Sequence, residues 1–348
     1  RSTPKPSSAA SDVYKRQEYQ NFWPITEIFP LYGVGMTTAR DEFVIDRDKE
    51  NLINRIRLFK HCKGSDEELH TLFRIRRKKG WSIRRAWEML QGIADRELPN
   101  FVVPVLYRPF DVRWIFYHDS VVWRTVKRIM RHMLAGENIG LIVPKQNKGD
   151  FGAYVCSHIG THKTVAVFDI NYYFPLYLYP DASKKHLFSE VEAEEGRRPN
   201  ISPDLLTALR DAYGREPSPE EVLGYIYAVL YAPSYREKYA EFLRIDFPRI
   251  PFTKDPELFC RLASLGTRLV GLHLLRSEEL DPPLARLHGE GDRKVAKTKG
   301  QGFRYEPGEE RVYINPDQYF EPVPQEVWEW LPVGISSFCV LRSDKKER

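Results

Sequence analysis

Residues 107–146 read YRPFDVRWIFYHDSVVWRTVKRIMRHMLAGENIGLIVPKQ, and this stretch decides the predicted fold. Four cations in its middle recur at spacings of three and four residues, which puts their side chains on one arc of a helix. They are Arg124, Lys127, Arg128 and Arg131. Apolar residues occupy the opposite arc and give the helix a face to bury. They are Val122, Val126, Ile129, Met130 and Met133. We therefore predict an amphipathic helix whose exposed face is a basic stripe.

The segments on either side of this helix are rich in β-branched and aromatic residues, so residues 111–117 and 139–144 are predicted to be strands of a supporting sheet. Planar cations, amides and aromatic side chains crowd the same region. They are Arg108, Arg113, Trp114, Tyr117, Trp123, Lys145 and Gln146. Such side chains contact phosphates and base edges in nucleic-acid interfaces. A solvated helix face and a packed core explain them equally well from composition alone.

Length and composition set the bounds. A chain of 348 residues with 42% hydrophobic content can bury a sizeable core, in one large domain or two. Its net charge is only +5, so whole-chain electrostatics give weak support for a polyanionic partner. The four cysteines are widely spaced and form no CxxC pair, which favours reduced thiols and a cytoplasmic setting. No long apolar run or signal-peptide core is present, so we expect no membrane partner.

The chain divides by composition into five parts, with boundaries at 1–21, 22–180, 181–218, 219–330 and 331–348. The first is a Ser-, Ala- and Pro-rich lead-in that we expect to be disordered or non-native, in a chain that begins with Arg and is expected to be a fragment of a longer protein. The second is the sheet-bearing part, and the third is a loop or boundary that includes an acidic run at 190–195. The fourth is a helical scaffold, and the fifth is an atypical tail. Ser-Pro and Asp-Pro helix starts at 202, 218 and 255 lead into the helices.

Two further segments carry cations. Ser65 and Glu68 have the spacing of a capping box and Gly80 suits a helix C-terminus, so a helix is predicted over 66–79. Its last turns hold five cations in the six residues 74–79, more than the helix dipole requires, which favours a backbone-phosphate role. Thr37 and Arg40 follow a Gly-rich turn and could also reach a phosphate, although a turn alone would explain the glycines.

No catalytic motif is evident. The sequence has no phosphate-binding GxxxxGK[ST] loop and no Gly-rich turn suited to a dinucleotide or adenosyl cofactor. Cys156, His158 and His162 have ligand chemistry, but no fourth ligand is near, so we predict no metal site. The Asn315-Pro316 dipeptide is interpreted as a turn, and Asp344 in the charged tail is assigned no catalysis. We predict no catalytic residue in this chain.

Several motifs in fixed order resemble one known family. YRPFDVRWI at 107–115, VKRIMRHML at 126–134, GLIVPKQ at 140–146 and FPLYLYP at 174–180 resemble the C-terminal specificity domain of Type ISP restriction-modification enzymes. GVGMTTARD at 33–41, YREKYAEFLRIDFPRIPF at 235–252 and RVYIN at 311–315 extend the similarity from about residue 25 to 330. These enzymes join a nuclease, a translocase, an adenine methyltransferase and a target-recognition domain in one polypeptide. The residues after Trp330 depart from the family pattern.

The resemblance implies a mixed α/β (α+β) fold, with a sheet-bearing DNA-recognition part followed by a helical part. It implies a target-recognition domain that binds double-stranded DNA and positions it for the methyltransferase domain of the same parent polypeptide. S-adenosylmethionine, ATP and Mg²⁺ are then expected only in the parent enzyme. The residues predicted to contact DNA are Thr37, Arg40, Arg108, Arg113, Trp114, Arg124, Lys127, Arg128, Arg131, Lys145 and Gln146. Two alternatives stay open: a divergent DNA adenine methyltransferase fragment, or a basic protein-interaction module.

Overall fold

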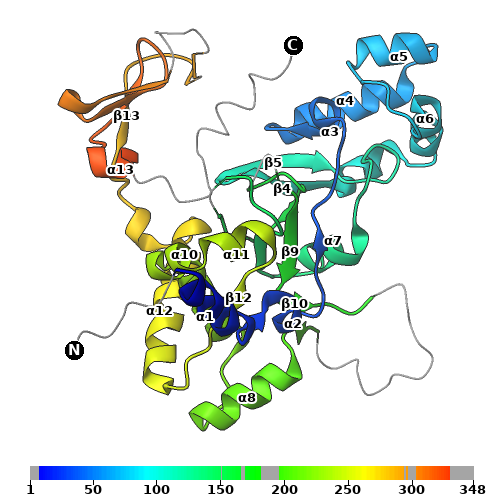
Figure 1. Cartoon of the computed structure of the whole chain (residues 1–348). Helices are drawn as coiled ribbons and strands as arrows, with labels where there is room; N and C mark the ends of the chain where they lie inside the picture. Colours follow the sequence, from blue (N-terminus) through cyan, green and yellow to red (C-terminus); the bar gives the residue numbers. More distant parts are fainter. Residues whose placement is uncertain are drawn as a thin grey trace, which may run out of the picture.

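The structure is a computed structural model and describes residues 8–149, 151–165, 169–181, 196–293, 295–296 and 303–329 (Figure 1). Its centre is a four-stranded antiparallel sheet with the strand order β2-β9-β6-β7. The strands are β2 (Gly33–Val34), β9 (Asn171–Pro175), β6 (Gly140–Pro144) and β7 (Tyr154–Cys156). The prediction of a strand at 139–144 is confirmed. Apolar residues fill every position of β6, as in strands that are covered on both faces.

The two faces of this sheet belong to two different hydrophobic cores. Leu141, Val143 and Phe174 point into a core shared with the helices α9 (Pro219–Tyr231) and α12 (Pro256–His273). Ile142 and Tyr173 point the other way, into a core shared with the first half of the chain. Each such side chain contributes roughly 1.5–3 kcal/mol when fully buried. The sheet therefore holds the N-terminal and helical parts together, and the predicted boundary after residue 180 does not separate two cores.

A second four-stranded sheet has the order β3-β5-β4-β8 and carries the predicted strand at 111–117. Its strands are β3 (Ile45–Asp46), β5 (Asp111–Phe116), β4 (Val102–Arg108) and β8 (Ile159–Gly160). Only the β4 and β8 pair is parallel. The helices α4 (Lys49–His61), α5 (Asp66–Leu72) and α6 (Ile83–Gln91) pack beside it and form a lobe at the upper right of Figure 1. A 3-10 helix, Asp95–Phe101, connects this lobe to β4.

The basic helix is shorter than predicted. It is α7 (Lys127–Leu134), and Ile129, Met130 and Met133 face the core as expected. Arg124 lies outside it, because Val126 has a positive φ of 50° that breaks the helical path. Arg124 instead exchanges two backbone hydrogen bonds with Thr37, with N···O distances of 2.9 and 3.0 Å. The expectation that Arg124 shares a helical stripe with the other three cations is therefore wrong, since pairing with a distant segment replaced the first helical turn.

The helix predicted over 66–79 ends at Leu72. Its Ser65–Glu68 capping box is present, but Arg74 takes a φ of 51° and the Ile75 amide then donates to the carbonyl of His70 at 3.0 Å. The helix therefore ends eight residues before Gly80. The cations of residues 74–79, called the basic loop below, therefore lie in a loop and not on a helix.

The lead-in differs from its prediction where it is described. Residues 8–20 form α1 (Ser8–Gln20), and Tyr19 is buried and stacks on Phe242 with ring centroids 4.8 Å apart. Aromatic packing against a segment far along the chain fixes this helix, which no local apolar periodicity could reveal. Residues 1–7, the acidic run at 190–195 and the tail at 331–348 lie outside the described residues. Residues 164–165 and 169–170, also apolar in part, are described and belong to no strand.

The helical part follows, with starts at the predicted positions. Its helices are α8 (Pro203–Tyr213), α9, α10 (Pro233–Lys238), α11 (Ala240–Ile245) and α12. The shorter elements in the rest of this body are α2 (Ile25–Ile28), α3 (Asp41–Val44), the pair β1 (Trp23–Pro24) and β12 (Arg249–Ile250), and the pair β10 (Tyr177–Leu178) and β11 (Arg198–Pro199). The segment 181–218 contains α8 and is therefore more than a loop.

The segment 219–330 is not helical throughout. After a 3-10 turn, Glu278–Leu280, it forms a small antiparallel sheet of order β13-β16-β15-β14. The strands are β13 (Arg286–His288), β14 (Arg304–Glu306), β15 (Arg311–Tyr313) and β16 (Tyr319–Glu321), with a 3-10 turn at Pro307–Glu309 and α13 (Gln325–Glu329) beside them. Strands of three residues are too short for a period of two to stand out. Asn315 accepts amide hydrogen bonds from Asp317 and Gln318 and makes the predicted turn. The mixed α/β class is confirmed.

Two buried histidines predict a loss of stability in acid. Burial lowers the pKa of His132 to about 4 and that of His273 to about 4. The unfolded chain has histidine pKa values near 6.5, so it binds more protons than the folded chain between these limits. Stability is full above pH ~6.5 and falls as the pH approaches ~4, by roughly 2–3 kcal/mol for each histidine. Urea denaturation at several pH values checks this, and His273→Gln should flatten the profile; an unchanged profile in that variant would contradict it.

Candidate nucleic-acid interface

One end of the central sheet gathers loops from distant parts of the chain. β2 and β6 end there and β9 begins there, because Pro144 pairs with Asn171 and Val34 with Tyr172. Gly35 follows β2 and passes so close to Thr161 that a Cβ would lie 2.5 Å from its carbonyl, which requires glycine. Residues 35–41 thus meet the segment after β8 at this end of the sheet.

Thr37 is held at this end from two sides. Its backbone pairs with Arg124, and its hydroxyl lies 3.3 Å from Nδ1 of His162. The His162 amide donates to the carbonyl of Met36 at 2.9 Å, and burial lowers the pKa of this histidine, so its imidazole is neutral near pH 7. The loop of Thr37 and the loop of Arg124 therefore form one rigid unit.

Arg40 lies beneath these loops and not on them. Its side chain is 5% exposed and its guanidinium lies 3.5 Å from the ring centroid of Trp81. Nη1 donates to the carbonyl of Val121 at 3.0 Å, while Nε1 of Trp81 donates to the carbonyl of Ser120 at 3.0 Å. Burial lowers the pKa of Arg40 to about 10, and its Nε and Nη2 are buried without a hydrogen-bond partner among the described residues. Arg40 thus braces the loop at 120–124 against Trp81, and is too buried for the phosphate contact that the sequence suggested.

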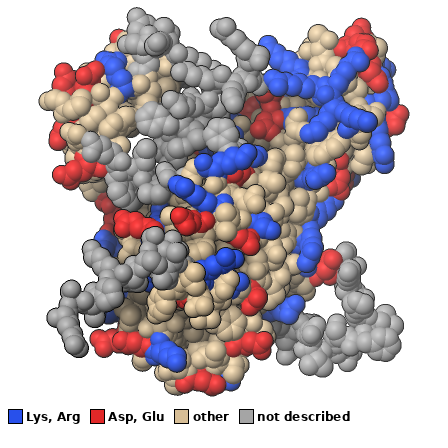
Figure 2. All heavy atoms as spheres, in the orientation of Figure 1, with Lys and Arg blue, Asp and Glu red and all other residues tan. Residues whose placement is uncertain are grey.

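The basic loop continues this surface. Nζ of Lys78 lies 5.0 Å from the ring centroid of Trp123, and the chain at Gly80 packs against the same ring. Arg74 and Arg76 line a small pocket beside Arg40. Figure 2 shows Lys and Arg gathered over the lobe of α4–α6 and along the edge below it. The signal for this loop was present in the sequence as five cations in six residues, and only its proximity to Thr37 and Arg124 was missing.

The cations that follow Trp123 differ in how they are paired. Arg124 and Arg128 are exposed, and within the described ranges neither has an ion-pair partner. Lys127 pairs with Asp119, and Arg131 donates to the carbonyl of Tyr179 at 3.0 Å. The Tyr179 contact places Arg131 toward the opposite end of the sheet, where β6 begins. The structure therefore brings Arg124 and Arg128 to the convergent loops and uses Arg131 to hold the segment after β10.

Lys145 and Gln146 extend from the end of β6, which is the same end of the sheet as Thr37. Both are exposed; Nζ of Lys145 lies 3.9 Å from a carboxylate oxygen of Asp246, a separation that allows only a weak, screened attraction. These two predicted residues therefore belong to the same end of the sheet as the convergent loops.

The predicted residues on the β4–β5 hairpin are more constrained. Arg108 is 8% exposed and donates to the carbonyl of Tyr107 at 2.7 Å. Arg113 pairs with Asp111, with Nη2 2.7 Å from Oδ2, and lies over the Tyr107 ring. Trp114 packs partly against the core with Lys49 over its ring. Packing and internal pairing thus account for Arg108 and Arg113, and burial leaves Arg108 inaccessible.

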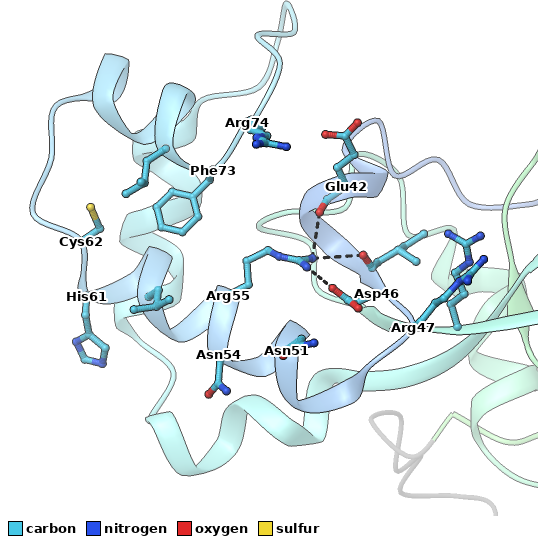
Figure 3. Close-up of a pocket in the computed structure, with 14 residues that line it drawn as sticks. Glu42, Asp46, Arg47, Asn51, Asn54, Arg55, His61, Cys62, Phe73 and Arg74 are labelled. Carbon is cyan, nitrogen blue, oxygen red and sulfur yellow. Dashed lines mark hydrogen bonds and ion pairs between the residues drawn. The ribbon is translucent and has the colours of Figure 1, made fainter. Parts of the chain in front are cut away.

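A hollow of about 1280 Å³ lies between α3, α4, α5 and β5 (Figure 3). Arg55 occupies its middle, where it pairs with Asp46 and donates to the carbonyl of Glu42 at 3.0 Å. In Figure 3 Arg74 lies above Arg55 and Arg47 lies to its right, and both line the hollow. The cations on its wall are consistent with an anionic ligand, and Arg74 connects this hollow to the basic loop.

Comparison with known proteins identifies the fold. The sequence model of the Type ISP C-terminal specificity domain matches residues 27–334. The chain belongs to this family. Three solved structures share the fold of this chain, and the first is the DrdV–DNA complex, with a TM-score of 0.66 and 24% identity over 92% of this chain and 32% of that one. The second is a nuclease-deletion mutant of the Type ISP restriction-modification enzyme LlaGI in complex with a DNA substrate mimic, with a TM-score of 0.61 and 18% identity over 92% of this chain and 29% of that one. The third is the ATP-dependent Type ISP restriction-modification enzyme LlaBIII bound to DNA, with a TM-score of 0.66 and 18% identity over 91% of this chain and 21% of that one. The chain spans a third or less of each. No curated protein matches it.

Two kinds of feature are not found in the described part of the specificity domain. No three His, Cys, Asp or Glu side chains are grouped there so as to hold a metal ion, and Cys156 and His162 hydrogen-bond instead to the carbonyls of His158 and Met36. None of its described helices combines the length and the apolar character that a bilayer crossing needs. The arrangement that stands out is a set of braced loops with exposed cations, which can bind a polyanion.

Proposed function

We propose that this specificity domain binds double-stranded DNA in a sequence-specific manner and positions it for adenine methylation by a methyltransferase domain carried elsewhere in the same parent polypeptide. The parent is a cytoplasmic restriction-modification enzyme. S-adenosylmethionine, ATP and Mg²⁺ serve that parent, and this chain supplies the grip on the duplex that flanks a flipped adenine.

One observation carries the proposal. Three segments that are far apart in the sequence, 37–41, 74–81 and 120–128, converge on one surface, where the exposed Arg124 and Arg128 have no carboxylate partner among the described residues. Arg77 and Lys127 of the same segments pair with Glu67 and Asp119. A cation without a carboxylate partner has no ion pair to lose when it meets a phosphate, and each phosphate neutralised releases counterions into solution. The similarity to three solved structures with DNA, described above, supports the same ligand.

Enrichment of binding sites from a random-sequence duplex pool tests the proposal. A specificity domain should recover a short, asymmetric motif, because base contacts and shape readout discriminate among sequences. The logarithm of the association constant for the recovered duplex should fall linearly with the logarithm of the salt concentration. The slope of this line, called the salt slope below, should be about −0.9 for each phosphate contacted. Binding that is insensitive to salt, or a pool that stays random after enrichment, would favour the protein-interaction module instead. Methyl transfer by the isolated chain would favour the methyltransferase alternative.

The variant Arg40→Ala tests whether Arg40 supports the loop at 120–124 or contacts a phosphate. Arg40→Ala removes the donor to the Val121 carbonyl and should reduce the free energy of unfolding by roughly 1–3 kcal/mol, because a buried acceptor is left without a partner. The slope of DNA affinity against salt should not change, since the buried guanidinium contacts no phosphate. Urea denaturation and a salt titration measure the two effects. A slope lowered by about 0.9 would show a direct phosphate contact instead.

A further inference from the structure

Trp123 differs from the other described tryptophans in what surrounds it. Trp81, Trp87 and Trp114 pack against the first core and Trp23 against the second. Trp328 stacks on Tyr305 with ring centroids 5.0 Å apart. Trp123 is partly exposed and belongs to neither core. Hydrophobic packing thus explains the other five rings and leaves this one unexplained.

The indole nitrogens show the same contrast. Nε1 of Trp81 donates to the carbonyl of Ser120 at 3.0 Å, and Nε1 of Trp87 donates to the carbonyl of Cys62 at 3.1 Å. Within the described part of the chain, Nε1 of Trp123 donates to no protein acceptor. A large ring with a free donor and an apolar body is the kind of side chain that dominates binding interfaces.

The backbone holds Trp123 firmly although its ring is not in a core. Its amide donates to the carbonyl of Thr38 at 3.3 Å, and the next residue, Arg124, makes the two-bond pair with Thr37. Beneath this loop lies the Arg40 and Trp81 stack. A ring on a rigid loop loses little entropy when it meets a ligand, so its contact area converts efficiently into affinity.

Its neighbours are cations. Lys78 lies over the ring, Arg124 follows in the chain, and Gly80, with a φ of +82°, lets the basic loop approach so closely that a Cβ would lie 3.3 Å from the ring edge. A ring flanked by two cations can contact a base while the cations bind the phosphates on either side of that base. Aromatic rings stack on a base of any sequence once its π face is exposed, as it is at a nucleotide that has left the duplex stack.

We propose that Trp123 contacts a nucleobase of bound DNA through its indole ring, between phosphates held by Lys78 and Arg124. The inference rests on the proposed function and adds the apolar part of the interface, which the cations do not provide. The contribution of Trp123 to the binding free energy does not depend on salt concentration, whereas the contributions of Lys78 and Arg124 do.

The test uses the full chain, a fluorescein-labelled random-sequence duplex and three variants: Trp123→Ala, Trp123→Phe and the control Trp328→Phe. Trp123→Ala should weaken binding by about tenfold without changing the salt slope, because stacking carries no charge. Trp123→Phe keeps an aromatic ring, so its DNA affinity should stay within about threefold of that of the unmodified chain.

The second readout is intrinsic fluorescence. It should fall when DNA binds, and this decrease should be lost in Trp123→Phe and kept in Trp328→Phe. Thermal unfolding midpoints of the two Trp123 variants should match that of the unmodified chain, because Trp123 belongs to neither core.

Three results would overturn the inference: unchanged affinity in Trp123→Ala, a fluorescence decrease that persists in Trp123→Phe, or a salt slope lowered by about 1 in Trp123→Ala, which would mean that the ring acts only by placing Lys78. These failures are distinct from a failure of the proposed function. In that case the unmodified chain itself would bind the duplex weakly and without salt dependence.

Discussion

Replacement of both Arg124 and Arg128 by Ala should weaken DNA binding by roughly ten- to a hundredfold at moderate salt and reduce the salt slope by about 1.8, because two phosphate contacts are lost. Both side chains are exposed at the convergent loops and have no ion-pair partner in the described ranges, so their removal leaves no buried charge behind. Stability should therefore stay within about 0.5 kcal/mol. Fluorescence anisotropy at several salt concentrations measures the affinity and the slope together.

The matched control is Arg210→Ala with Arg261→Ala. These arginines are also exposed, and they lie on α8 and α12, away from the lobe of α4–α6 in Figure 1. Arg210 lies 3.6 Å from a carboxylate oxygen of Glu216, an exposed pair that contributes little to stability. This variant has the same net charge as the Arg124 and Arg128 variant, so it separates a local contact from a general loss of positive charge. Equal weakening in the two double variants would mean that no localised DNA surface exists here.

Gly266→Ala should be the most destabilising small substitution in the helical part, with a loss of roughly 3 kcal/mol or more. A Cβ at this position would lie 1.7 Å from the carbonyl oxygen of Gly224, where α12 crosses α9. The amide nitrogen of Ala228 would lie 3.0 Å away. Both of these atoms belong to the backbone, so no side chain can rotate away and the two helices must separate. Their separation would disturb the core that supports the central sheet, and urea denaturation should show a lower midpoint.

Gly271 provides the control on the same helix. A Cβ there meets only the Cβ of Ser277 at 4.0 Å, and its backbone is helical, so Gly271→Ala should stabilise the chain by up to about 1 kcal/mol through helix propensity. If Gly266→Ala were as stable as Gly271→Ala, close crossing of α9 and α12 would not be what holds this core together.

Local features of the fold were predictable because their causes are local. The capping boxes at Ser65 and Ser218 specify helix starts within four residues of chain, and the structure has both. The strand runs at 111–116 and 140–144 carry enough β-branched and aromatic residues to be recognised alone. The small sheet of β13–β16 was missed, because each strand has three residues and gains its pairing from partners outside any short window.

By itself, the sequence determined the family, through motifs in fixed order, and the mixed α/β class, through helix starts and strand runs. Tertiary structure alone decided which cations are available to a ligand. Arg40 and Arg124 were both predicted to contact DNA, yet one is buried against Trp81 and the other is exposed beside Thr37. The physical reason is that the burial of a charged side chain depends on contacts between segments far apart in the chain, and neither periodicity nor local propensity contains those contacts.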